Sequence, residues 1–120
     1  MTMRLMCKSK IHRARIKKAD MHYEGSIGID KAIMAAADIL PFEMVHVLNV
    51  TSGARFETYA IEERPGSGMV ALYGAAAHLG EVGDILIILS YALLDEKAAR
   101  AIKPRIVRVD SENRIARKRS

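Results

Sequence analysis

The Gly25–Ser26 step is the place in this chain where residue types and spacing point to bond-making chemistry. It closes the segment Asp20-Met21-His22-Tyr23-Glu24-Gly25-Ser26. Glycine tolerates backbone geometry that other residues cannot adopt, so strain can be stored at the Gly25 carbonyl. The Ser26 hydroxyl lies close to that carbonyl along the chain, and a twisted peptide would let it attack in an N→O acyl shift. A Gly-Ser step is also an ordinary turn, so the surroundings must decide between the two interpretations.

Other catalytic and metal-binding patterns are missing from the sequence. The histidines lie at no metal-ligand spacing, and there is a single cysteine, Cys7. No glycine-rich dinucleotide loop, phosphate loop or GxSxG elbow occurs. Carboxylate pairs such as Glu62-Glu63 fall in expected turns, where solvated surface is the simplest interpretation. We therefore expect no metal cofactor.

Glycine and proline divide the chain into short elements that must position these residues. We expect strands at 10–18, 27–29, 44–50, 55–61, 69–72, 84–92 and 105–109, with 84–92 the most buried. In the first strand, His12 should share the face of Ala14 and Ile16. Helices are expected over 31–37, with Asp30 as N-cap, and over 95–102. Many short strands so closely spaced predict a single domain, 1–120, folded as a small, closed, mostly β barrel.

Charge is distributed unevenly along the 120 residues. Residues 1–18 carry seven basic and no acidic side chains, 19–100 carry five and twelve, and 101–120 carry seven and two. The basic ends are typical either of a nucleic-acid footprint involving Arg114, Arg117, Lys118 and Arg119 or of a solvated strand face with a frayed tail. Aromatic residues make up only 5% and tryptophan is absent, which argues against a base-stacking platform. We expect no nucleic-acid partner.

The apolar stretches and the single cysteine bear on location. The longest apolar stretch, 85–94, is half the length of a membrane span and is interrupted by Ser90. Basic residues at positions 4, 8 and 10 break any signal-peptide core. A lone cysteine fits a reducing compartment. We expect a cytoplasmic protein without a membrane partner.

Several sequence motifs together resemble the pyruvoyl-dependent aspartate 1-decarboxylase family. The segment HYEGS is preceded by KSKIHRARIKKAD and followed by NVTSGARFETYAI and GAAAH. Each motif alone is weak, but they occur in order from about Met3 to Val109 without large gaps. The resemblance implies a mainly β fold, a six-stranded double-psi β-barrel with short helices. It also implies a homotetramer with active sites between subunits.

The resemblance further implies self-cleavage between Gly25 and Ser26. Residues 1–25 would become the β chain and residues 26–120 the α chain, with Ser26 converted to a pyruvoyl group and no pyridoxal phosphate (PLP) required. That ketone would form a Schiff base with L-aspartate and act as electron sink for its decarboxylation. The products would be CO2 and β-alanine, which feeds pantothenate and coenzyme A synthesis. A maturation factor is a further partner that the resemblance allows.

Residue roles also follow from the matching motifs. Thr58 corresponds to a threonine that supports cleavage and contacts substrate, and Tyr59 to the proton donor. Tyr23 corresponds to a pocket residue beside the cleavage point. Arg55 and Lys10 have the charge to bind the substrate carboxylates, although both also suit a solvated strand surface. The residues whose backbone would line the pocket are Gly74, Ala75 and Ala76.

One position departs from the family pattern. Tyr73 occupies a site where the family usually has asparagine, and a phenol is bulkier than an amide and lacks its carbonyl. This change bears on how readily the chain is cleaved and how well the pocket fits aspartate. A barrel that has kept the fold and lost processing is the remaining alternative.

Overall fold

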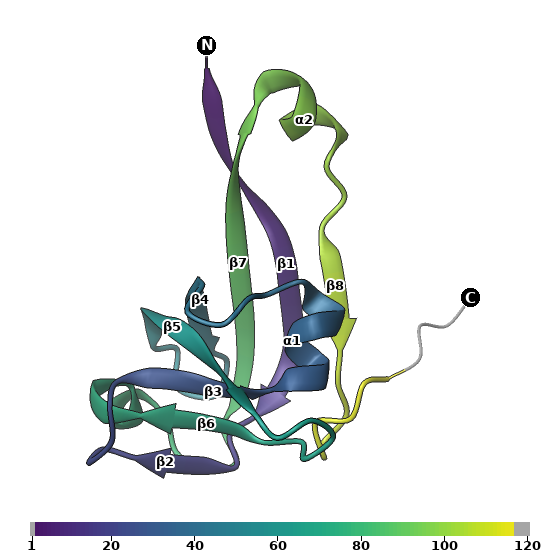
Figure 1. Ribbon diagram of the computed structural model, residues 1–120. Coiled ribbons are helices and arrows are strands. Elements are labelled where there is room, and N and C mark those ends of the chain that lie inside the picture. Colours follow the sequence, from purple (N-terminus) through teal and green to yellow (C-terminus); the bar gives the residue numbers. More distant parts are fainter. Residues whose placement is uncertain (1, 117–120) are drawn as a thin grey trace.

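The computed structural model describes residues 2–116 and contains eight strands, two α-helices and one 3-10 helix (Figure 1). The N-terminal half contains β1 (Met3–Arg15), β2 (Lys18–Asp20), β3 (Ser26–Asp30), α1 (Lys31–Ala37) and β4 (Met44–Asn49). The C-terminal half contains β5 (Arg55–Glu63), β6 (Val70–Tyr73), the 3-10 helix η1 (Gly74–Leu79), β7 (Ile85–Asp95), α2 (Glu96–Ala101) and β8 (Arg105–Arg108).

All eight strands belong to one mixed sheet with the order β2-β6-β3-β5-β4-β7-β1-β8. Strands β1 and β2 lie near opposite ends of this order, yet two residues connect them. Within that connection the Ile16 N–H donates to the Asp84 carbonyl (3.0 Å) and the Lys17 N–H to the Val70 carbonyl (2.8 Å). The sheet must therefore curl until its two ends approach each other.

The interior of the curled sheet is aliphatic. Its largest fully buried side chains are Ile11, Ile16, Ile27, Ile29, Ile33, Met34, Leu72, Leu86, Ile88, Val45, Val47 and Val70. Strand β3 is buried at every position, whereas β7 alternates between buried and half-buried residues. The expectation that 84–92 would be the most buried strand was therefore wrong. Strand β3 lies between β5 and β6, and side chains cover both of its faces.

The predicted mainly β class with short helices is confirmed. Asp30 caps α1 by accepting the Ala32 N–H (2.8 Å), and Asp95 caps α2 by accepting the Ala98 N–H (2.8 Å). The strand number differs from the expected six because β2 and β8, of three and four residues, also pair at the edges of the sheet. Strand β2 is too short to show a readable alternation, whereas β8 coincides with the strand expected at 105–109. The hydrogen-bonded order is open rather than a simple closed ring.

The first strand differs most from its prediction. It begins at Met3 rather than Lys10 and pairs with β7 to form a long arm that projects from the body (Figure 1). A bulge lies between His12 and Ala14, where Arg13 adopts a positive φ of 69°. The extra residue changes the face that follows it, so Ile11 rather than His12 shares the core with Ala14.

Candidate functional site

The Gly25–Ser26 peptide lies at the entry to β3, where the exposed segment 21–25 meets a fully buried strand. Ser26 is only 1% exposed. Its hydroxyl donates to the carbonyl of Glu24 (3.2 Å), the residue before Gly25. The Ser26 side chain is therefore withdrawn from bulk water and held beside the peptides that precede it.

Gly74 packs directly against this peptide. Its φ is +64°, and a Cβ at this position would lie 2.6 Å from the Gly25 Cα and 2.9 Å from the Tyr23 carbonyl oxygen. A side chain is excluded here on both conformational and steric grounds. The nitrogen of Ala75 lies 4.0 Å from a Cβ built on Gly25, and Ala76 is buried behind it. The predicted Gly74–Ala76 loop thus lies beside the candidate cleavage point.

Strand β5 brings two further predicted residues to the same place. Ile27 of β3 pairs with Ala60 of β5 in a parallel register. Tyr59 and Thr58 precede Ala60 on β5 in the same way as Ser26 and Gly25 precede Ile27. The Tyr59 ring packs against the ring of Phe42, with 6.0 Å between their centroids. Tyr23 stands on the other side, with its ring 4.8 Å from that of Tyr73.

Two predicted residues lie away from this group within a single chain. Arg55 is exposed at the start of β5, roughly 13 Å along the strand from Tyr59 at about 3.3 Å per residue. Lys10 lies on β1, which β7, β4 and β5 separate from β3 in the sheet. Strand pairing therefore joins neither predicted carboxylate-binding cation to the Gly25–Ser26 peptide.

Sequence reasoning missed Glu63, which it assigned to solvated surface. Glu63 is half-buried at the end of β5 and accepts a 2.6 Å hydrogen bond from the Tyr73 hydroxyl. Burial, followed by this contact with the Glu63 carboxylate, raises the pKa of the Tyr73 phenol well above its ordinary value. The hydroxyl is thus committed to Glu63 as a hydrogen-bond donor. A buried tyrosine requires a hydrogen-bond partner for its hydroxyl, so the position of Tyr73 in an apolar strand was the sequence feature that could have indicated a polar partner.

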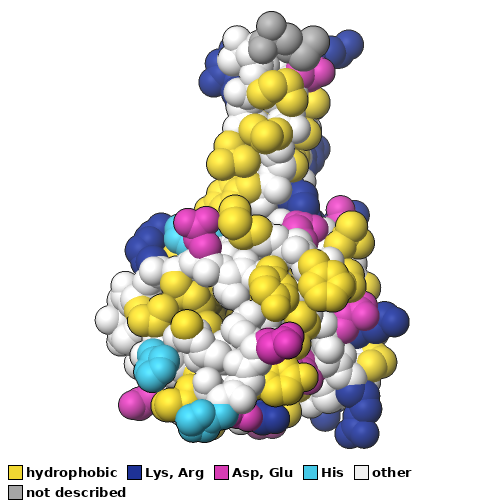
Figure 2. Space-filling model, turned by 60° about the vertical axis from the view of Figure 1, so that its left-hand side comes forward, with side chains coloured by type: hydrophobic (Ala, Val, Ile, Leu, Met, Phe, Trp, Pro, Cys, Tyr) yellow, Lys and Arg dark blue, Asp and Glu magenta, His cyan; other side chains and the backbone are white. Residues whose placement is uncertain are grey.

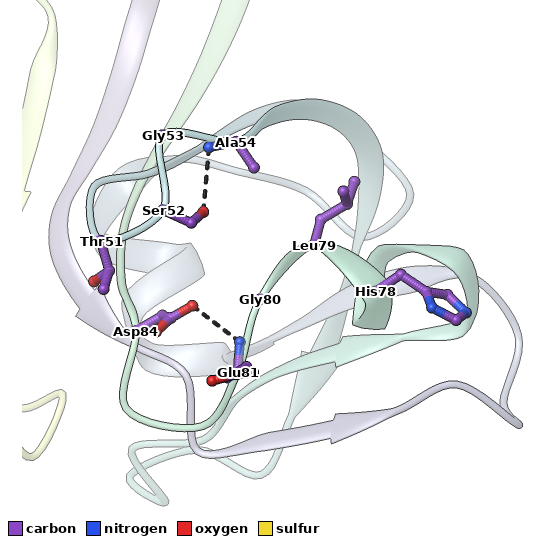
Figure 3. Close-up of a pocket in the computed structure, with 9 residues that line it drawn as sticks. All are labelled: Thr51, Ser52, Gly53, Ala54, His78, Leu79, Gly80, Glu81 and Asp84. Atoms are coloured by element: carbon purple, nitrogen blue, oxygen red, sulfur yellow. Dashed lines mark hydrogen bonds between the residues drawn. The ribbon is translucent and has the colours of Figure 1, made fainter.

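A cavity of about 650 Å³ opens elsewhere, between the turn 51–54 and the segment 78–84 (Figure 3). Its polar groups already have structural partners. Asp84 accepts from the Asn49 amide (2.9 Å) and the Glu81 N–H (3.0 Å), and the Thr51 hydroxyl accepts the Ile85 N–H (3.0 Å). The first of these bonds, followed by the second, lowers the pKa of Asp84. None of the predicted site residues lines this cavity.

The structure also bears on metal, membrane and nucleic-acid interpretations. No group of three or more potential metal ligands occurs among residues 2–116. In that part of the chain, no helix has both the length and the apolar character to cross a membrane. Two basic residues near the N-terminus are paired with acids, Arg4 with Glu96 (2.7 Å) and Lys8 with Glu43 (3.1 Å). Arg117, Lys118 and Arg119, on which the nucleic-acid alternative depends, lie outside the described residues.

Fold and site together define a small, mainly β protein that holds a Gly-Ser peptide at the mouth of a buried strand. A family model described as aspartate decarboxylase matches residues 1–116. The chain belongs to the aspartate decarboxylase family. This membership confirms the family predicted from the sequence and, with it, the enzyme class of lyases.

Relatives named aspartate 1-decarboxylase resemble the chain over nearly its whole length. The protein from Thermoanaerobacter pseudethanolicus is 55% identical over 92% of this chain and 95% of its own length. The one from Syntrophus aciditrophicus is 54% identical over 93% of this chain and 97% of its own. A rationally designed double-psi β-barrel protein, mkDPBB_sym_86, matches 66% of this chain and 91% of its own, with 19% identity and a TM-score of 0.47.

Proposed function

We propose that this protein converts L-aspartate to β-alanine and CO2 in the cytoplasm, for pantothenate and coenzyme A synthesis. The catalytic group is a pyruvoyl made from Ser26. The observation that carries the proposal is the close packing of Gly74 on Gly25, directly before the buried Ser26. Family membership supports the substrate, because the relatives are named for aspartate.

The pyruvoyl group forms from the chain itself. The Ser26 oxygen attacks the Gly25 carbonyl carbon, the amide C–N bond breaks, and an ester forms with release of the Ser26 amine. Loss of the Ser26 Cα proton then expels the Gly25 carboxylate and leaves a dehydroalanine. Water adds to this group and ammonia leaves, which yields the ketone. We assign to Thr58, two residues before Ala60 as Gly25 is two residues before its partner Ile27, the hydrogen bond to the oxygen that becomes negative in the first step.

The surroundings of Ser26 fit such a group. Position 26 is buried, and backbone and small residues of the Gly74–Ala76 loop lie next to it, so a planar ketone fits without displacing a large side chain. When present, the pyruvoyl group supplies a ketone that condenses with the substrate amine and accepts electrons from the bond to the departing carboxylate. Tyr59 then donates a proton to the substrate carbon. The guanidinium of Arg55, on a side chain long enough to extend along β5, provides two parallel N–H donors for a substrate carboxylate.

A second copy of the chain completes the site in this proposal. An apolar stripe begins on the arm with Leu93 and Leu5, which pair across β7 and β1. It continues through Met44, which lines a cavity with Leu5, to Phe42 beside Tyr59. Phe42 is 75% exposed, and Figure 2 shows hydrophobic side chains along the arm and the body below it. An adjoining subunit that covers this stripe would bring its own Lys10 toward Ser26, as in the homotetramer that the resemblance implies.

The wild-type protein provides the direct test of the reaction. After prolonged incubation we expect two chains on a denaturing gel, and an intact mass for residues 26–120 that carries pyruvoyl in place of serine. We expect this material to release CO2 from L-aspartate. A single uncut chain with an ordinary serine and no CO2 release would contradict the proposal.

Mixing two inactive variants tests the shared site. Lys10→Ala keeps Ser26, and Ser26→Ala keeps Lys10, so co-assembled subunits should form some complete sites at their interface. We expect CO2 release above that of either variant assembled alone. Co-assembly of Lys10→Ala with the double variant Lys10→Ala/Ser26→Ala is the matched control and should restore nothing. Equal activity in both mixtures would place Lys10 outside the site.

A further inference from the structure

Tyr73 occupies a special place in the sheet relative to the candidate cleavage point. On one side it pairs with Asp20, the last residue of β2, and on the other with Ser26, the first residue of β3. The segment Met21–Gly25 connects these two residues. Tyr73 therefore lies between the two ends of the loop that carries the Gly25 carbonyl.

The Tyr73 side chain is fixed on several sides. Its ring packs against Tyr23, in the middle of the loop, with 4.8 Å between the centroids. The Lys18 ammonium lies 5.5 Å from the centre of the same ring. Its hydroxyl donates to Glu63 Oε2 at 2.6 Å, a short, charge-assisted hydrogen bond. Of these contacts, the hydrogen bond to Glu63 is the one that anchors the end of the side chain.

Gly28 makes room for the partner of Tyr73. A Cβ at position 28 would lie 1.9 Å from Glu63 Oε2 and 2.8 Å from its carboxyl carbon. The Glu63 carboxylate therefore lies directly over the Gly28 backbone. Any larger residue at position 28 would push this side chain away, so Gly28, Glu63 and Tyr73 act as one unit.

We propose that the Tyr73–Glu63 pair is a positioning device that holds the Met21–Gly25 loop in the conformation from which Ser26 attacks Gly25. The Tyr73 hydroxyl is committed to Glu63, so Tyr73 acts through Tyr23 and the loop rather than on the reacting atoms. The kinetic part of this inference rests on the proposed self-cleavage. The structural part, an ordered loop, does not.

Hydrogen exchange in a Ser26→Ala background tests the structural part, because that chain stays uncut whether or not self-cleavage occurs. Adding Tyr73→Phe keeps the ring and removes the donor. We expect amide exchange in residues 21–25 to become about ten- to a hundredfold faster, as for the loss of one hydrogen bond to a charged group. Exchange in β1 and β7 should stay unchanged. Tyr91→Phe, which removes a 3.3 Å contact with His46 on the far side of the sheet, is the matched control.

The rate of self-cleavage tests the kinetic part. We expect Tyr73→Phe and Glu63→Ala each to slow the appearance of the 26–120 fragment by about ten- to a hundredfold. Glu63→Gln, which keeps an acceptor, should restore most of the rate. The double variant Tyr73→Phe/Glu63→Ala should be cleaved no more slowly than either single variant, since both substitutions remove the same hydrogen bond. Once cleaved, these variants should show a smaller change in kcat than in the cleavage rate, because the Tyr73 hydroxyl is bonded to Glu63 and does not act on the reacting atoms.

Two results would overturn the inference. The first is unchanged exchange in residues 21–25 on removal of the Tyr73 hydroxyl. The second is a cleavage rate for Tyr73→Phe equal to that of wild type. Failure of the wild-type chain to cleave at all would instead refute the proposed function, and the exchange experiment would still decide whether the pair orders the loop.

Discussion

Replacing Ser26 by alanine is expected to leave one uncut 120-residue chain with no measurable release of CO2 from L-aspartate. The substitution removes the only oxygen that can attack the Gly25 carbonyl from within the dipeptide, and with it the precursor of the ketone. The fold should persist because the side chain is small and its one recorded hydrogen bond goes to the Glu24 carbonyl. Intact mass and CO2 release, followed over days, measure the two effects.

The chain offers an internal comparison for this experiment at Gly66–Ser67. This second Gly-Ser step is exposed, and the Ser67 hydroxyl accepts the N–H of Met69 (3.1 Å) in a turn. Ser67→Ala should cleave at the wild-type rate and keep its activity. Cleavage between residues 25 and 26 in the Ser26→Ala chain, or its loss in Ser67→Ala, would contradict the assignment.

Tyr59→Phe is expected to separate cleavage from decarboxylation. The ring that packs on Phe42 is kept, so β5 should stay in place and the chain should still be cut. The lost hydroxyl is the proposed proton donor, and removal of a general acid costs about 10²- to 10⁴-fold in rate. We therefore expect a normal 26–120 fragment with pyruvoyl and a kcat lower by about that factor.

Two other results with Tyr59→Phe would contradict its assignment as proton donor. If Tyr59→Phe turns over aspartate at the wild-type rate, the hydroxyl is not the donor and Tyr59 is a cross-strand aromatic residue. If instead the chain is no longer cut, Tyr59 acts in maturation. Measurement of fragment mass and of kcat on the same preparation distinguishes these cases.

Elements with local signals were predicted well from the sequence. Asp30 and Asp95 precede alanine-rich runs; Asp30 is the expected N-cap of the first helix, and Asp95 caps the helix expected to begin there. The strands expected at 44–50 and 55–61 both form, and they pair antiparallel across the turn at 51–54. The bulge at Arg13 was missed because it depends on how β1 pairs with β7, which no local pattern contains. One extra residue there was enough to place His12 on the wrong face.

The site was predictable where it depends on backbone and less so where it depends on tertiary contacts. Gly25, Ser26 and Gly74 were singled out from the sequence, and the structure brings them together. Glu63 was missed because its partner, Tyr73, lies on another strand and only the folded sheet joins them. The separation of Lys10 from Ser26 likewise follows from strand order, which the sequence does not display.

The strand partners of β1 and β2 have a consequence for the form that the protein would take after the proposed cleavage. Both strands lie within residues 1–25. Strand β1 pairs with β7 and β8, and β2 pairs with β6, and a break between residues 25 and 26 would remove none of these hydrogen bonds. They also supply Ile11 and Ala14 to the interior. The cleaved protein would thus consist of two fragments that remain associated, and residues 1–25 would dissociate only when the whole domain unfolds.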